Sequence, residues 1–347
     1  MGKRIVSLLL SAVLAVSCLT GCAKKEITEE TKPVPAKKEI VSVTEEAQAD
    51  GKTLVIDTTV EVPDLSSLEE VTLCFDEDLL DTMVEELVHS QYPGLKEGTV
   101  DGYRDWSVAT EEQLLFSLSL TDDGFEAGRI YYLDVLRDLN GQDMGEDEHH
   151  NSTPYYMTEH IPDKLNMPAA EAAETLGTFL GQYSCFDYKP WNVVAVNCRN
   201  VPGSSGYYQA KMQPQYDGLP VLIDGVPYVS TCLSAEGVFT FQGVMVLKEQ
   251  SRKPADATMP LEEAVEQFKA DSAEDPQGDQ VTVDRITAGY LAQSHYSGTW
   301  TLSPVWVFEY SAVGPTADNR VATTYYTYAY RMDSRDLYSD VSGFDIS

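Results

Sequence analysis

The chain has 347 residues, of which 56 are Asp or Glu and 24 are Lys or Arg, so its formal net charge at neutral pH is −32. Nucleic acids and anionic lipid surfaces bind basic patches, so this composition argues against both as partners. Hydrophobic residues make up 43% of the chain, which is enough for sizeable cores, and the length favours two or three domains.

The chain begins with two basic residues and an apolar run at residues 5–19. This order is typical of a secretory signal, and the run is shorter than the roughly 20 residues that a spanning helix needs. Leu-Thr-Gly-Cys at residues 19–22 resembles the lipobox of bacterial lipoprotein precursors. The resemblance implies removal of residues 1–21 and a lipid on Cys22. An ordinary signal peptide or a short membrane helix is the alternative.

Residues 22–52 are predicted to be a flexible tether. Lys, Glu, Thr and Pro dominate much of this segment, and such a stretch cannot bury enough apolar surface to offset its ordering entropy. The lipid on Cys22 makes the bilayer the first predicted partner. The predicted location is therefore the extracytoplasmic face of the cell membrane.

Residues 53–160 are predicted to form an N-terminal α+β domain. Strands are indicated by the β-branched run at residues 54–62 and by residues 113–120 and 128–136, the last two joined through an Asp-Asp-Gly turn signal. Apolar residues at helical spacing after Asp76 predict a helix that Asp76 can cap.

The second half contains an internal repeat. Met-Pro-Ala-Ala-Glu-Ala at residues 167–172 recurs as Met-Pro-Leu-Glu-Glu-Ala at residues 259–264, and each copy opens an amphipathic helix. Strand-like runs follow both helices. Residues 161–252 and 253–347 are therefore predicted to be two successive helix-on-antiparallel-sheet units, and the fold class is α+β.

The second half resembles the paired units of PepSY-type and YycH/YycI-like extracytoplasmic regulatory proteins. The two Met-Pro helix starts carry this resemblance, together with Leu-Ser-Pro-Val-Trp-Val-Phe at residues 302–308. The whole chain also resembles an uncharacterised family of Gram-positive (Firmicutes) lipoproteins in which a strand such as residues 56–63 follows the tether. One departure is that residues 324–330 lack the Asp-Gly ending common in the related units. The resemblance bears on architecture and implies no catalytic residues.

Four cysteines remain once the signal and Cys22 are set aside: Cys74, Cys185, Cys198 and Cys232. Four cysteines in an exported chain can form two disulfides. Cys185 and Cys198 are the predicted pair, because they flank the strand-like run at residues 191–196. No CxxC pattern is present, which argues against a zinc knuckle or a redox motif. Buried, unpaired thiols are the alternative.

Candidate catalytic chemistry is sparse. Three of the five histidines cluster with carboxylates in residues 147–160, but their spacing fits no zinc motif, which favours a solvated acidic loop. The sequence has no GxSxG elbow, no glycine-rich phosphate loop and no EF-hand pattern. We therefore predict no metal, no cofactor and no enzymatic activity.

Aromatic residues give the candidate binding surface. Alternate residues of a strand point the same way, so Tyr326, Tyr328 and Tyr330 are predicted to line one face. With Trp306 they are the candidate binding aromatics, which can stack on sugar rings or form a protein interface. The alternative is that these residues simply pack in half-buried antiparallel strands.

The sequence thus predicts a membrane-anchored, non-catalytic lipoprotein that binds or regulates another cell-envelope protein. A lipoprotein that binds a glycan, a peptide or a cation is the first alternative, and a cell-wall hydrolase is the second. Nucleic acid is not an expected partner.

Overall fold

The computed structural model describes residues 39–49, 52–100, 103–109, 114–121, 128–134, 156–158, 165, 167–197, 206–255, 259–274, 280–295, 298–315 and 321–346. All of them belong to one compact unit, Lys37–Ser347. The predicted signal peptide and Cys22 lie outside the described residues, as do the three clustered histidines, His149, His150 and His160.

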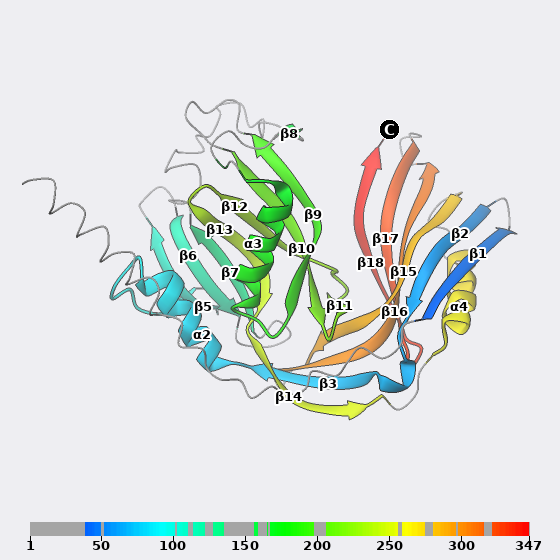
Figure 1. Ribbon diagram of the computed structural model, residues 1–347, viewed down its shortest axis with the longest axis horizontal. Helices are drawn as coiled ribbons and strands as arrows, with labels where there is room; N and C mark the ends of the chain where they lie inside the picture. Colours follow the sequence, from blue (N-terminus) through cyan, green and yellow to red (C-terminus); the bar gives the residue numbers. More distant parts are fainter. Residues whose placement is uncertain are drawn as a thin grey trace, which may run out of the picture. The chain divides into compact units, whose positions relative to one another are not determined.

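Most of the elements are labelled in Figure 1. In order they are β1 (Glu39–Ala49), β2 (Lys52–Val62), η1 (Leu65–Ser67), β3 (Glu69–Phe75), α2 (Glu77–Met83), η2 (Val84–His89), β4 (Gly98–Val100), β5 (Tyr103–Ala109), β6 (Leu114–Thr121), β7 (Arg129–Asp134), β8 (Tyr156–Thr158), α3 (Ala169–Gly181), β9 (Asp187–Asn197), β10 (Tyr207–Tyr216), β11 (Leu219–Ile223), β12 (Val229–Ser234), β13 (Gly237–Met245), β14 (Leu247–Pro254), α4 (Leu261–Glu274), β15 (Gln280–Ser294), β16 (Thr299–Pro315), β17 (Val321–Arg331) and β18 (Leu337–Ile346). The fold combines helices with strands, as predicted, but it is richer in sheet than a typical α+β protein.

The strands form one large mixed sheet with two helix-covered parts. The part called here the α3 sheet has the order β4-β5-β6-β7-β13-β12-β10-β9-β8, and every neighbouring pair in it is antiparallel. The α4 sheet has the order β1-β2-β15-β16-β17-β18, in which only β2 and β15 run parallel. Strand β11 pairs with both β10 and β15, so the hydrogen bonding passes from one part to the other.

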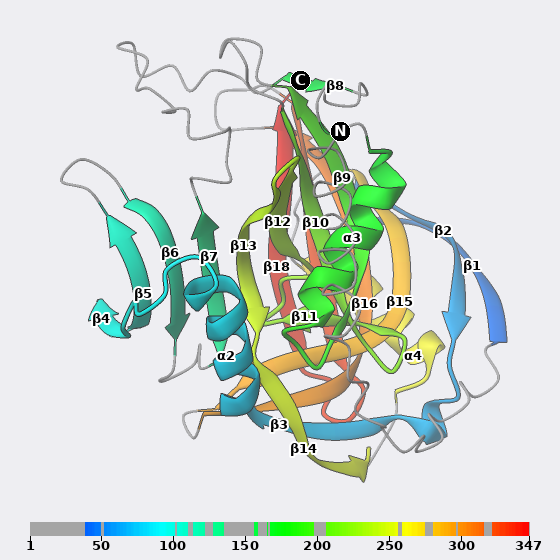
Figure 2. The same cartoon turned by 60° about the vertical axis from the view of Figure 1, so that its left-hand side comes forward.

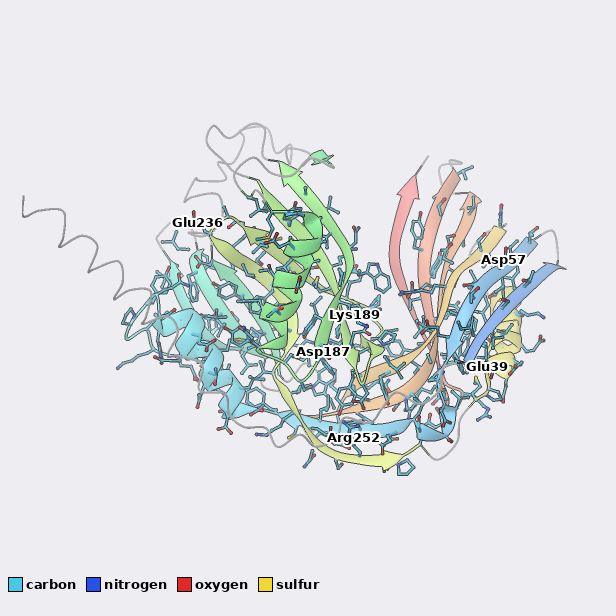
Figure 3. All side chains as sticks on the ribbon, viewed as in Figure 1. Glu39, Asp57, Asp187, Lys189, Glu236 and Arg252 are labelled. Carbon is cyan, nitrogen blue, oxygen red and sulfur yellow. The ribbon has the colours of Figure 1, made fainter. Side chains whose placement is uncertain are left out.

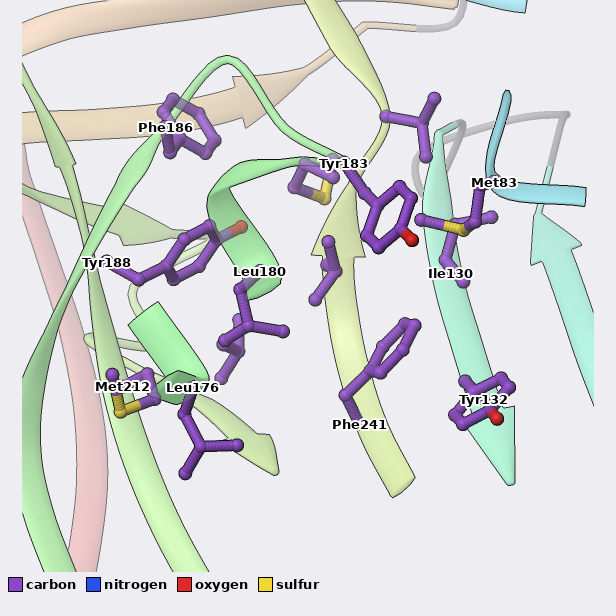
Figure 4. Packing of buried hydrophobic residues seen from close by; sticks show 14 of the residues in the cluster. Met83, Ile130, Tyr132, Leu176, Leu180, Tyr183, Phe186, Tyr188, Met212 and Phe241 are labelled. Atoms are coloured by element: carbon purple, nitrogen blue, oxygen red, sulfur yellow. The ribbon is translucent and has the colours of Figure 1, made fainter. Parts of the chain in front are cut away.

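The α3 sheet buries one face under α2, η2 and α3. Leu176 and Leu180 of α3 and Met83 of α2 pack in the same core as Phe241 and Tyr132 of the strands (Figure 4). Figure 2 shows α2 and α3 in front of the strands they cover, and Tyr183 after α3 donates its hydroxyl to Glu86 of η2 at 2.7 Å. The opposite face of the α3 sheet, called here its open face, carries no helix of the described residues.

The α4 sheet buries one face under α4. The stripe predicted from sequence, Leu261, Ala264, Val265 and Phe268, is buried in this core together with Ile56 and Phe308 of the strands. Residues at this spacing fall on one side of a helix, and the rest of α4 is polar except for two alanines. Burial of this stripe therefore accounts for how the helix is held.

Both helices begin in the same way. The hydroxyl of Tyr208 donates to the carbonyl of Met167 at 2.7 Å, just before α3. The indole N–H of Trp306 donates to the carbonyl of Met259 at 2.8 Å, just before α4. In each case an aromatic donor on a strand fixes the Met-Pro start of the helix over its sheet.

Two predictions about the N-terminal part were wrong. The tether was predicted to continue to residue 52, but Glu39–Ala49 forms β1 and pairs with β2 along its whole length. The separate domain predicted for residues 53–160 is not observed, although its helix and strands are. Its strands divide: β2 pairs with β15, β3 pairs with β14 and β16, and β7 pairs with β13. Their partners lie more than a hundred residues further along the chain, which no local pattern reveals.

Candidate binding surface

The predicted binding aromatics lie in the core. Trp306 and Tyr330 are fully buried and Tyr328 is 4% exposed. Tyr326 is half-buried, and its ring stacks on that of Tyr310 with centroids 5.1 Å apart. The tyrosines do share one face of β17, as predicted, but it is the face that α4 covers. The interpretation as an exposed aromatic surface was wrong, because the apolar stripe of α4 packs against these rings and buries them.

The cysteines give no disulfide among the described residues. Cys185 is present as a thiol, and burial raises its pKa to about 12. Its predicted partner Cys198 lies outside the described residues, so the bond between them stays a prediction.

Trp191 on β9 is the exception among the tryptophans. The other three are 4% exposed or less: Trp106, Trp300 and Trp306. Trp191 is half-buried, and it sits at an irregularity of the sheet, where the pairing of β9 with β10 shifts between Lys211 and Met212. Lys211 pairs with Asn192 and Met212 with Pro190, so Trp191 is the extra residue of a β-bulge.

The bulge decides which way these side chains point. Tyr188 and Val193 belong to or pack against the core under α3, and Met212 is buried in it. Strand alternation therefore puts Lys189 and Lys211 on the open face. The extra residue shifts the alternation by one, so Trp191 and Asn192 both point to the open face as well. Figure 3 labels Asp187 and Lys189 on this strand.

The neighbours of Trp191 come from β10, from β15 and from the segment just before β12. Its ring lies 6.1 Å from the ring of Tyr228, centroid to centroid. Lys211 donates from Nζ to the Tyr228 hydroxyl at 3.0 Å and lies 4.1 Å from the centre of that ring. The guanidinium of Arg285, on β15 of the α4 sheet, lies 4.9 Å from the centre of the Trp191 ring. We call Lys189, Trp191, Asn192, Lys211, Tyr228 and Arg285 the Trp191 cluster.

The carboxylates beside the cluster are held by other groups. Glu309 on β16 accepts two hydrogen bonds from Arg285, one of them from Nε at 3.0 Å. Burial raises the pKa of Glu309, against the opposing effect of Arg285. Burial also raises the pKa of Asp284, whose carboxylate accepts a hydrogen bond from Ser311. Both oxygens of Glu309 are thus engaged in an ion pair, which leaves it poorly placed to transfer a proton.

Two cations of the cluster have no ion-pair partner. Of the Lys and Arg residues whose side chains the structure describes, Lys96, Lys189 and Lys211 are those for which no carboxylate lies within ion-pair distance. Two of these three therefore lie on the open face beside Trp191. In a chain with net charge −32, this local arrangement is unusual.

Other polar clusters serve packing. The guanidinium of Arg252 forms hydrogen bonds or ion pairs with groups from β3, β10 and β14 and from the turn after β10. A depression of about 480 Å³ is lined by residues of α3 and by Gln182 after it, and no other described element forms an opposing wall. Among the described residues no group of three or more metal-ligand side chains comes together. The helices found in those residues are too short or too polar to cross a membrane.

From the sequence, Trp191 was predicted only to begin the strand-like run at residues 191–196 between the two cysteines. The available signal was Pro190, because proline inside a strand is confined to edges and bulges, and bulges re-aim side chains. The neighbours of Trp191 depend on the later chain, because Tyr228 precedes β12 and Arg285 lies on β15.

Comparisons with known proteins bear on the fold alone. No family model matches the chain. No curated protein matches its sequence either. Among solved structures it is similar to an uncharacterised protein from Eubacterium rectale ATCC 33656, with a TM-score of 0.52 and 13% identity over 85% of this chain and 93% of that one. This architecture therefore occurs in at least one experimentally determined structure.

Proposed function

We propose that this chain is an extracytoplasmic lipoprotein, anchored to the cell membrane through a lipid on Cys22, whose folded part is a non-catalytic binding module. The Trp191 cluster carries the binding role. It combines Trp, Tyr and Arg, the residue types that dominate binding hot spots, on a sheet face that no described helix covers. The engaged state of Glu309 favours binding over hydrolysis at this surface.

The anchor is tested by replacing its cysteine. We expect Cys22→Ala to abolish lipid attachment, because the thiol is the only group at that position that can take the diacylglyceryl chain. The wild-type chain should then sediment with membranes and label with a radioactive fatty acid, whereas the variant should do neither. Cys185→Ala is the matched control and should label like the wild type. Equal labelling of Cys22→Ala and wild type would remove the anchor from the proposal.

The binding surface is tested by photocrosslinking in cells. A benzoylphenylalanine placed at the exposed position of Asn192 should give one dominant adduct, which disappears when Trp191→Ala is added. The matched control places the same group at exposed Glu171 on the outer side of α3. Identical adducts from both positions, or an adduct that survives Trp191→Ala, would contradict binding at the Trp191 cluster.

A partner protein of the envelope, which the sequence predicted, is a second candidate ligand and would bind at a different place. One observation supports it: within the described residues β1 pairs only with β2, so the outer edge of an 11-residue strand is available for strand addition. In that case the lipoprotein binds or regulates the partner through this edge.

We also propose that the α3 and α4 sheets with their helices are related units, as the repeated Met-Pro helix starts predicted. The matching bonds to the carbonyls of Met167 and Met259 support this. The resemblance to PepSY-type and YycH/YycI-like regulatory proteins is proposed on the same basis.

A further inference from the structure

We infer that the Trp191 cluster is a binding site for a neutral saccharide. The inference rests on the proposed function, because it names the class of ligand that this surface takes. It follows from three properties of the described residues: the aromatic rings, the hydrogen-bonding groups around them and the balance of charge.

The rings provide a surface for stacking. Trp191 is only partly buried, while Arg285 lies over its ring and Tyr228 lies beside it at 6.1 Å between centroids. These two contacts hold the indole in place, so little conformational entropy remains to be lost on binding. A pyranose ring has apolar C–H faces, and an aromatic ring buries such a face over a large area.

The groups around the rings match hydroxyls. A sugar hydroxyl both donates and accepts, and so does the amide of Asn192, which the bulge turns to the same face as Trp191. Lys189 and Lys211 supply donors that no carboxylate occupies. Asp187, exposed on the same face of β9, supplies an acceptor.

The charges near Trp191 balance. The cations are Lys189, Lys211 and Arg285. The carboxylates are Asp187 two residues before Lys189, Glu309 bound to Arg285, and Asp284 next to Arg285. A polyanion or a polycation therefore finds no net attraction here, and the overall negative charge of the chain opposes a polyanion further.

The centre of a protein interface usually has different residues from those around Trp191. The centre of such an interface is apolar and depleted of charged residues. Tyr228 and Arg285 fit such a centre, but Lys189, Lys211 and Asp187 on the open face around Trp191 do not. A protein occupant is therefore the competing outcome of the test.

Calorimetric titration of the full-length lipidated chain, kept in a detergent that carries no sugar, tests the inference. The probes are a saccharide digest of purified cell wall and the tetramers of glucose and N-acetylglucosamine. At least one probe should bind saturably, and Trp191→Ala should weaken that binding by about tenfold or more. Tyr103→Ala, which removes a half-buried tyrosine on β5, is the matched control and should bind like the wild type. Unfolding midpoints of all three chains show whether the fold is retained.

The outcomes separate the inference from the proposed function. Binding that Trp191→Ala weakens and Tyr103→Ala leaves unchanged supports the saccharide site. If none of the three probes binds while crosslinking from Asn192 yields a protein, the saccharide site is overturned and the binding function stands. If none binds and crosslinking from Asn192 gives no adduct that depends on Trp191, both are overturned. Weakening by Tyr103→Ala equal to that by Trp191→Ala would also place the saccharide elsewhere.

Discussion

Phe268→Ala should lower the free energy of unfolding by about 4 kcal/mol, the usual cost of removing a fully buried phenylalanine ring. Phe268 is fully buried on α4, and its ring stacks on Phe308 with centroids 4.7 Å apart and an interplanar angle of 5°. It also meets the edges of Tyr310 and Tyr328, at 5.2 and 5.9 Å between centroids. The substitution therefore leaves a cavity between helix and sheet, lined by rings that cannot easily collapse into it.

Urea unfolding followed by circular dichroism measures this effect. Glu266→Ala is the matched control on the same helix. Glu266 is exposed and pairs with Lys269 one turn later, so its loss should cost no more than about 0.5 kcal/mol. Phe268→Leu, which keeps much of the volume, should fall between the two. Equal stabilities for Phe268→Ala and Glu266→Ala would mean that α4 is not held by this ring.

The α4 core also shows how far sequence reasoning reaches. The apolar stripe of α4 and the shared face of Tyr326, Tyr328 and Tyr330 follow from helical and strand periodicity, and the structure has both. Periodicity does not say whether solvent or a helix covers a strand face. The tyrosines were therefore assigned the right face and the wrong surroundings.

The pairing of strands that lie far apart in the chain could not be predicted from the sequence for a related reason. Strand β2 was predicted, but its parallel pairing with β15 places Leu54 opposite Val281, a contact that no local signal encodes. The Trp191 cluster could not be predicted because it depends both on the direction of a strand side chain and on long-range pairing. A bulge at Pro190 sets the direction of Trp191, and a residue on a distant strand, Arg285, completes its surroundings.

A second large effect is expected where Arg252 joins three parts of the chain. Its guanidinium donates to Glu249 on β14 at 2.8 Å, to Asp217 in the turn after β10 at 2.7 Å and to the Tyr216 hydroxyl at 2.9 Å. It also lies 3.4 Å from Glu69 at the start of β3. Figure 3 labels Arg252 on β14. One cation thus neutralises three carboxylates that β14, β3 and the β10–β11 turn bring together.

Arg252→Met should lower the free energy of unfolding by about 2 kcal/mol at neutral pH, because the three carboxylates then repel one another without a counter-charge. The side chain of Arg252 is 28% exposed, so part of the effect is screened by water. Arg335→Met is the matched control: Arg335 pairs with the single carboxylate of Glu263 at the surface, where water screens the pair, so its removal should leave the stability almost unchanged.

The pH dependence distinguishes this network from ordinary packing. Hydrogen bonding to Arg252 lowers the pKa of Glu249 below its usual value. A carboxyl whose pKa is lower in the folded chain stabilises the fold above its unfolded pKa, and this stabilisation is lost as the pH falls through the folded pKa. The difference in stability between wild type and Arg252→Met should therefore shrink as the solution is acidified from neutral pH. A difference that stays constant with pH would mean that Arg252 acts through the packing of its aliphatic stem and its contact with the Tyr216 ring, at 5.2 Å, instead of through its charge.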